Sequence, residues 1–213
     1  EICRALHSLH NINNKPATQE QVQKFYCEKT IQRVSQVQSL IPFFEEQELI
    51  INGKSCVNPF AKKHRTHFVR KLESVKADSF CIIHGDPTFN NIIIGNNDEP
   101  FFFDPRGIFA SEKIYGDPDY DWAKLYYSVA TNYDSVNEKK FKLKYSGKQI
   151  DYQIDSSGWE NLERDLITAS ETKADKIFLL VCAIWFSLCG YDRNYDTILM
   201  SFVKGVELWQ KVK

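Results

Sequence analysis

Three short apolar runs, separated by segments rich in turn residues, most constrain how this chain can fold. Cys81-Ile82-Ile83, Ile92-Ile93-Ile94 and Phe101-Phe102-Phe103 each hold three consecutive apolar residues. Runs of this length, bounded by turn residues, are typical of short buried strands. They predict a small β element at the centre of the fold, with tight polar loops between its strands.

Most of the remaining chain has the apolar spacing of helices. We read Asn52-Gly53 as part of a linker and residues 141–154 as a hairpin that turns at Ser146-Gly147. Asp117-Pro118 opens a helix, because proline is favoured in a helix's first turn. The other expected helices cover residues 2–10, 18–40 and 59–75, two segments that open near 157 and 172, and a last one at 196–212. The sequence therefore predicts one mostly helical α+β domain over residues 1–213.

Composition excludes several classes of protein. The formal net charge of −1 argues against a nucleic-acid-binding protein, which normally has a clear basic excess. No apolar run approaches the length of a membrane span. Six cysteines occur without a Cys-x-x-Cys pair, so zinc is not indicated and the thiols are expected in the core of a protein from a reducing compartment. We therefore expect a cytoplasmic protein with no membrane span.

One polar loop between the first two runs has the residues that phosphoryl transfer needs. It reads His84-Gly-Asp-Pro-Thr-Phe-Asn-Asn91, and Asp104 directly follows the third run. Phosphoryl transfer requires a base for the attacking hydroxyl and oxygen ligands for magnesium, held rigidly together. Asp86 is the expected catalytic base, and Asn91 and Asp104 are the expected Mg²⁺ ligands, since magnesium prefers oxygen donors.

These motifs, taken in order, resemble the aminoglycoside phosphotransferase and choline kinase family, the small-molecule relatives of protein kinases. His84-Gly-Asp-x-x-x-x-Asn91 is followed by Asp104, and Gly116-Asp-Pro-Asp-Tyr-Asp121 is similar to a further family segment. Leu6-His7 resembles an element of an early helix in these enzymes. The resemblance implies that Asp121 and His84 support the catalytic loop, with Asp121 accepting hydrogen bonds from its backbone.

The same resemblance implies an activity. An enzyme of this family would transfer the γ-phosphate of ATP, with Mg²⁺, to a hydroxyl of an aminoglycoside, a sugar or an amino alcohol such as choline. Asp104-Pro-Arg106 departs from the sequences that follow this aspartate in relatives, and Arg106 is a candidate contact for a phosphate or an anionic substrate group. No motif identifies the acceptor.

A family feature is missing from the 213 residues. Relatives have an amino-terminal ATP-binding lobe with a glycine-rich loop and a phosphate-binding lysine, but only Gly53 precedes Gly85 here. The chain is therefore expected to be the carboxy-terminal lobe of a longer protein, inactive by itself and partnered by the missing lobe. The alternative is a non-catalytic kinase-like module that binds a metabolite or a protein. The joint presence of Asp86, Asn91, Asp104 and Asp121 favours the enzyme.

Overall fold

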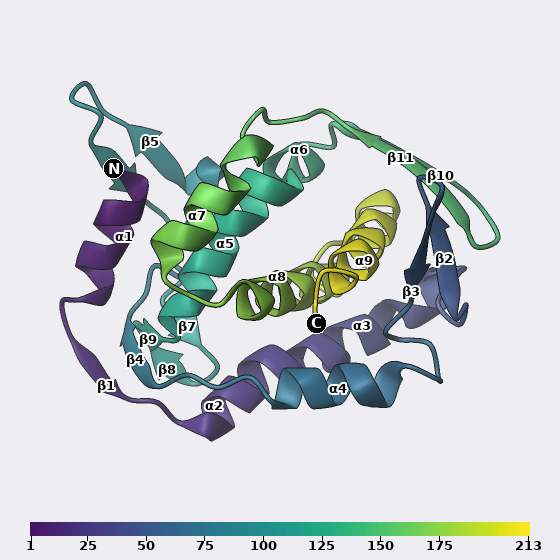
Figure 1. Ribbon diagram of the computed structural model, residues 1–213, viewed down its shortest axis with the longest axis horizontal. Coiled ribbons are helices and arrows are strands. Elements are labelled where there is room, and N and C mark those ends of the chain that lie inside the picture. The colour runs from purple at the N-terminus through teal and green to yellow at the C-terminus, as the bar shows by residue number, and fades with distance from the viewer.

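Helices dominate the structure, a computed structural model that describes residues 1–213. Helices hold 49% of the residues and strands 18%, so the predicted α+β class is confirmed. The nine α-helices are α1 (Ile2–His10), α2 (Gln19–Gln23), α3 (Lys29–Val37), α4 (Arg65–Glu73), α5 (Pro118–Thr131), α6 (Tyr133–Asn137), α7 (Glu163–Ser170), α8 (Ala174–Cys189) and α9 (Tyr195–Trp209) (Figure 1).

Short helical segments of other types complete these elements. A π-helical segment, η1 (Lys24–Glu28), joins α2 to α3, and the 3-10 segment η2 (Gln38–Leu40) ends the long helix predicted here. The helix expected from residue 59 begins only at Arg65. Asn58 explains the difference, because its side-chain oxygen accepts a hydrogen bond from the Phe60 N–H and fixes a turn. The remaining 3-10 segments are η3 (Phe89–Asn91) and η4 (Glu160–Leu162).

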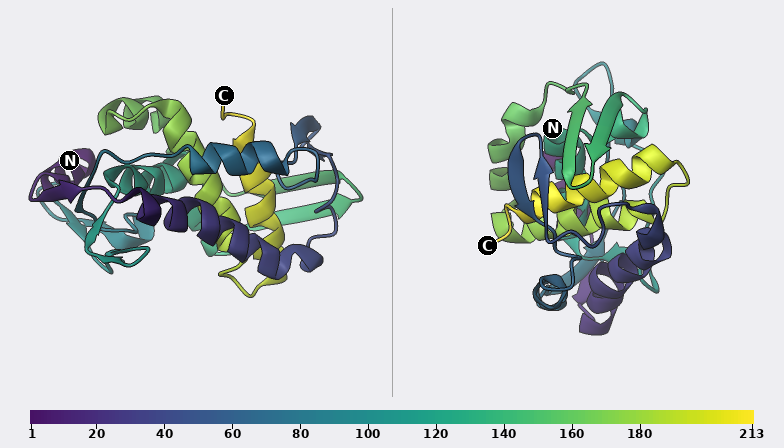
Figure 2. Two further views of the ribbon diagram at one scale, coloured as in Figure 1. Left: turned by 90° about the horizontal axis from the view of Figure 1, so that it is seen from below. Right: turned by 90° about the vertical axis from the view of Figure 1, so that its right-hand side faces the viewer.

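The two most apolar helices form the centre of the core. Helix α8 packs along α9 and also contacts α3 and α5. Figure 2 shows α8 (yellow-green) and α9 (yellow) beside each other, and one connected hydrophobic cluster reaches from Leu6 to Trp209. Five of the six free cysteines are buried in this molecule, as expected. None of the helices combines the length and the apolarity needed to cross a membrane.

The strands of this α+β fold form four small sheets and not one small central element. One sheet has β1 (Asn14–Pro16), β4 (Ser79–Ile82) and β9 (Tyr115–Gly116), and a second has β10 (Phe141–Ser146), β11 (Gln149–Ile154), β2 (Glu48–Ile51) and β3 (Lys54–Val57). The other two are hairpins: β5 (Ile92–Ile94) with β6 (Pro100–Phe102), and β7 (Ile108–Phe109) with β8 (Glu112–Lys113). Sheets of two to four strands suffice because helices supply most of the core.

Two predictions about individual strands need correction. Asn52-Gly53 is the turn of the β2–β3 hairpin, and both residues have positive φ, 46° and 77°. Asn-Gly is favoured in such two-residue turns, because both tolerate this backbone region. The runs in β5 and β6 are strands, but they are not buried. Ile93 is 58% exposed and Phe101 54% exposed, because their hairpin projects from the helices (Figure 1).

Candidate active site

The loop with the predicted base begins where β4 leaves the core. Gly85 has φ +81°, and a Cβ atom there would lie 2.5 Å from the carbonyl oxygen of Arg106. Only glycine fits this backbone and this close approach. Asp86 follows at the inner end of the loop and is only 3% exposed. The predicted base is therefore a buried carboxylate and not a solvent-facing one.

Helix α5 holds this loop through Asp121. The helix starts at Pro118 because the Asp117 side chain accepts a hydrogen bond from the Asp119 N–H and caps it. Asp121 then lies in the first turn, fully buried. Its carboxylate accepts hydrogen bonds from the backbone N–H groups of His84, at 2.8 Å, and Gly85, at 2.7 Å. These are the contacts that the sequence led us to expect of Asp121.

A histidine that sequence reasoning did not assign also contacts Asp121. His10 Nε2 lies 3.0 Å from Asp121 Oδ2, and both side chains are buried. The carboxylate accepts, so His10 donates. His7, the histidine in the family-like element, instead donates from Nε2 to the carbonyl oxygen of Ala169. No local pattern could have found the contact between His10 and Asp121, because 111 positions separate the two residues.

His84 connects the loop to the segment that carries Asp104. Its Nε2 donates to the carbonyl oxygen of Phe103 at 3.1 Å, and its Nδ1 accepts from the Asp86 N–H at 3.2 Å. The two contacts together require the tautomer with the proton on Nε2. His84 is buried and its ring nitrogens contact backbone groups only, so its geometry is that of a supporting residue.

Asn91 and Asp86 are joined directly. The side-chain amide of Asn91 donates to the backbone carbonyl oxygen of Asp86 at 2.9 Å, which leaves Asn91 Oδ1 without a partner in the protein. The intervening turn is held from outside. Phe89 N–H donates to Ser128 Oγ, and Asn90 N–H donates to Asp134 Oδ1, each at 3.2 Å. The loop is therefore fixed at both ends and in its middle.

The backbone around Asp104 is hydrogen-bonded to this loop, but the Asp104 side chain does not contact it. Its neighbours bracket the loop, since Phe103 N–H donates to the Asn91 carbonyl and Arg106 N–H to the His84 carbonyl. Asp104 is exposed, has φ 55° and makes no hydrogen bond or ion pair. The structure thus brings Asp86 and Asn91 together and leaves the Asp104 carboxylate free at the edge of the loop.

Two cations face the Asp86 carboxylate. Arg106 Nε lies 3.2 Å from Asp86 Oδ2, and Lys124 Nζ lies 2.9 Å from Asp86 Oδ1. Each oxygen of this carboxylate therefore has a cation within ion-pair distance. Sequence reasoning named Arg106 but missed Lys124. The spacing in the sequence could have identified Lys124, because it follows Asp121 by three positions and therefore lies on the same face of the helix.

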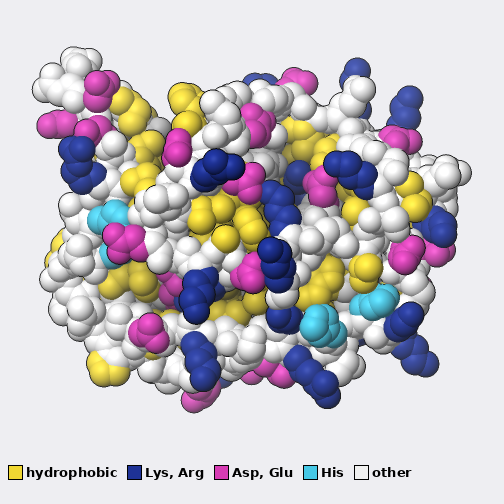
Figure 3. Space-filling view, viewed as in Figure 1, with side chains coloured by type: hydrophobic (Ala, Val, Ile, Leu, Met, Phe, Trp, Pro, Cys, Tyr) yellow, Lys and Arg dark blue, Asp and Glu magenta, His cyan; other side chains and the backbone are white.

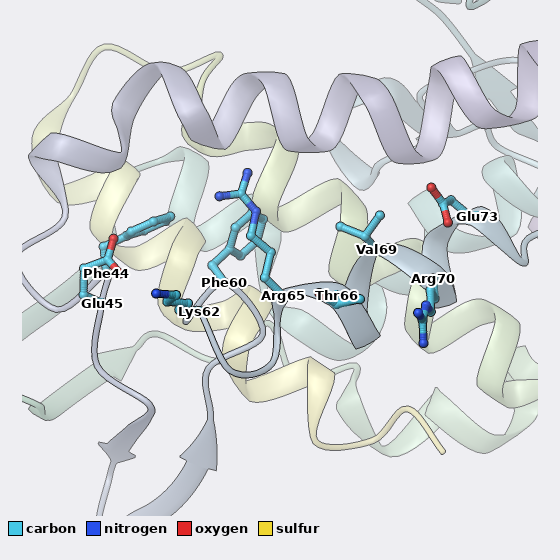
Figure 4. A pocket seen from close by; sticks show the side chains of 9 residues that line it. All are labelled: Phe44, Glu45, Phe60, Lys62, Arg65, Thr66, Val69, Arg70 and Glu73. Carbon is cyan, nitrogen blue, oxygen red and sulfur yellow. The ribbon is translucent and has the colours of Figure 1, made fainter.

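Asp86 lies in the wall of a hollow of about 720 Å³. Asn91, Arg106 and Lys124 also line it, and α3 contributes Lys29 and Arg33. A second hollow, of about 610 Å³, lies along α4. Figure 4 shows the side chains that line it, from Phe44 to Glu73. It contains none of the predicted site residues, so we assign the site to the hollow beside Asp86.

The environment of this hollow shifts the pKa of several groups. Burial, together with the positive charges of Arg33 and Lys124, lowers the pKa of Lys29 to about 7. Burial lowers the pKa of Arg106, but the charges of Asp86, Tyr191, Tyr133 and Asp104 together outweigh it, so the net pKa is raised. Burial raises the pKa of Tyr120, and the charges of Asp86 and Asp121 add to the effect. The wall therefore combines a cation of weakened basicity with hydroxyls that keep their protons.

No family model matches the chain, and neither a curated protein nor a solved structure matches it. The roles proposed for Asp86, Asn91 and Asp104 therefore rest on the motifs and on the geometry described above.

Proposed function

We propose that this chain is the catalytic lobe of a phosphotransferase that moves the γ-phosphate of ATP to a hydroxyl group of a small molecule. The observation that carries the proposal is the joint placement of Asp86 and Asn91 in one loop. Asp86 has a buried carboxylate whose two oxygens face the side chains of Arg106 and Lys124, and Asn91 holds the Asp86 carbonyl while its own oxygen stays free. This arrangement supports the resemblance to the aminoglycoside phosphotransferase and choline kinase family.

Asp86 is the general base in the proposed reaction. The acceptor hydroxyl gives its proton to Asp86 while its oxygen bonds to the γ-phosphorus. The bond from that phosphorus to the oxygen bridging it to the β-phosphate breaks, and ADP leaves. Asp121 and His84 are positioning residues, because they contact the loop's backbone. Arg106 and Lys124 flank Asp86, where cations stabilise the charge of a transferring phosphoryl group.

The free oxygens at the loop fit magnesium. Asn91 Oδ1 and the Asp104 carboxylate are oxygen donors without protein partners, and magnesium needs few protein ligands because it keeps waters and phosphate oxygens. When bound, the ion would neutralise part of the charge of the ATP phosphates. The exposure of Asp104 leaves its side chain able to turn toward such an ion.

A non-catalytic binding module is the second candidate, and one observation favours it. Both oxygens of the Asp86 carboxylate face a cation, so the group is already engaged when no substrate is present. A module that only binds a ligand, and recognises it by shape and charge, could use the same arrangement of charges. The two candidates differ in turnover, and a transfer assay separates them.

The test uses the natural full-length protein with Mg²⁺, ATP labelled at the γ-phosphate and a panel of hydroxyl compounds. The phosphotransferase predicts label on an acceptor, with release of ADP that depends on that acceptor. The binding module predicts that a compound occupies the hollow while no label is transferred to it. Saturable binding without transfer under the same conditions would contradict the proposed enzyme.

A comparison of chain lengths tests the proposed division into lobes. The 213 residues contain no glycine-rich loop before Gly85, so alone they are expected to bind ATP weakly and turn over little. The natural full-length protein is expected to regain both properties. Strong Mg²⁺-dependent hydrolysis of ATP by the 213 residues alone would contradict the need for a further ATP-binding lobe.

A further inference from the structure

The hollow beside Asp86 is far more basic than the protein as a whole. Its wall carries four basic side chains, Lys29, Arg33, Arg106 and Lys124, against one acidic side chain, Asp86. The chain as a whole has a net charge of −1, and Figure 3 shows acidic and basic side chains interspersed on the face that it draws. The excess of positive charge is therefore a local property of this cavity.

Two of the four cations have no carboxylate partner. Arg106 and Lys124 pair with Asp86, whereas Lys29 makes no hydrogen bond or ion pair and lies over the ring of Phe25. Arg33 donates only to the carbonyl oxygen of Ser187. Lys29 and Arg33 are four positions apart, so they lie on the same face of α3. Half-buried cations without a carboxylate partner are costly, and a bound anion would offset that cost.

The wall also holds a hydroxyl that is not committed to the protein. Tyr127 lines the hollow and is 1% exposed, and its hydroxyl has no hydrogen-bond partner. Buried tyrosine hydroxyls normally have one. Its ring stacks on Tyr133, at 4.1 Å between centroids, and the pair gives the hollow an aromatic side. Cations, a free hydroxyl and an aromatic face together make a site suited to a polar ring with a negative charge.

We propose that the acceptor is an anionic hydroxyl compound, a sugar or polyol with a phosphate or carboxylate group, whose anionic group binds Lys29 and Arg33 while its hydroxyl faces Asp86. The inference rests on the proposed function for the reaction at Asp86, and it narrows the acceptor class. Aminoglycosides and choline are cations, and the four basic side chains repel them.

Inorganic phosphate is the probe for the anionic subsite. Calorimetric titration of the full-length protein in a chloride buffer without nucleotide should show saturable binding. Lys29→Met and Arg33→Met should each weaken it about tenfold or more, because each removes a charge-assisted hydrogen bond. Lys62→Met and Arg65→Met, which change basic residues in the second hollow, are the matched controls and should leave the affinity unchanged. Thermal unfolding checks that each variant folds; methionine at 29 removes a poorly solvated charge and should not unfold the protein.

A second arm separates the acceptor's anionic group from the phosphates of the nucleotide. With Mg²⁺ and a non-hydrolysable ATP analogue, Lys29→Met should change the affinity for the analogue by less than about threefold, since phosphate and nucleotide occupy different places. Competition between phosphate and the analogue, with a tenfold loss of both in Lys29→Met, would overturn the proposal and assign these cations to the nucleotide.

A third experiment compares ligands that share one sugar ring and differ in charge. Glucose 6-phosphate should bind more tightly than glucose, and glucosamine should bind more weakly than either. Three results would each overturn the inference. The first is the absence of saturable phosphate binding, and the second is a loss of phosphate affinity in the Lys62 and Arg65 controls in place of the Lys29 and Arg33 variants. The third is tighter binding of choline or an aminoglycoside than of any anion. These readouts do not involve turnover, so a failure of the proposed phosphotransferase activity would leave them interpretable.

Discussion

The ammonium group of Lys124 lies 2.9 Å from the carboxylate of Asp86, although 38 positions separate the two residues in the sequence. The helix that carries Lys124 also carries Asp121, which binds the backbone on the amino-terminal side of Asp86. One helix, α5, therefore sets both the position of the loop and the charge beside its central carboxylate. A change in α5 should affect the site even where it touches no substrate.

The first prediction concerns the stability that Asp121 provides. Asp121→Ala should lower the free energy of unfolding by about 3 kcal/mol or more, because it leaves two buried N–H groups and His10 without an acceptor. Urea unfolding measures the change. Asp78→Ala, at an exposed aspartate without side-chain contacts, is the control and should stay within about 0.5 kcal/mol of the original protein. Equal effects of the two substitutions would rule out the anchoring role.

The second prediction separates the charge of Asp104 from its backbone conformation. Asp104→Asn should weaken Mg²⁺-dependent nucleotide binding by about tenfold or more, because it removes the charged oxygen ligand. Asparagine tolerates the positive φ of this position, so the backbone should not change. Asp98→Asn is a matched control, since Asp98 is also exposed and has φ 58°. A Mg²⁺ titration of nucleotide affinity that is the same for both variants would remove Asp104 from the site.

The third prediction follows from the lowered pKa of Lys29, about 7. A lysine with this pKa is charged below pH 7 and loses its charge as the pH rises, so anion affinity should fall as the pH rises. Sulfate, whose charge is constant in this range, should bind about tenfold more weakly at pH 8 than at pH 6 if the bound anion restores the charge. The other charged and titratable groups in the wall of this hollow are Asp86, Arg33, Arg106, Lys124, Tyr26, Tyr120, Tyr127, Tyr133 and Tyr191.

The control for this pH dependence is Lys29→Met. It should bind sulfate weakly at both pH values, with little slope between them. A slope of the same size in the variant would assign the titration to another group in the wall. No slope in the original protein would show that Lys29 keeps one charge state over the whole range.

Local patterns predicted the helices and the loop because these depend on nearby residues. The Asp117-Pro118 start of α5 and the His84 to Asn91 loop follow from capping, turn chemistry and motif spacing. The Asn52-Gly53 hairpin was missed although its turn signal was present, since the flanking strands are only four residues long. The exposure of Ile93 was missed for another reason. An apolar run shows that a strand forms, but not whether another element covers it.

Contacts between distant segments could not be predicted from the sequence. His10 meets Asp121 across 111 positions, and Lys29 on α3 lines the same hollow as Asp86. Such pairs depend on how the helices pack around α8 and α9, which no short-range spacing encodes. The basic character of the hollow follows from this packing, so no single motif predicts it.

The most direct test of the account is the steady-state kinetics of Asp86→Asn in the natural full-length protein, with an acceptor found by the transfer assay. The substitution should lower kcat by about 10²-fold to 10⁴-fold, because it removes the base that takes the hydroxyl proton. The KM for ATP should stay within about threefold, because in the proposed mechanism Asp86 contacts the acceptor hydroxyl and not the nucleotide phosphates. A kcat within about threefold of the original value would contradict the role of Asp86 as the base, and with it the proposed phosphotransferase mechanism.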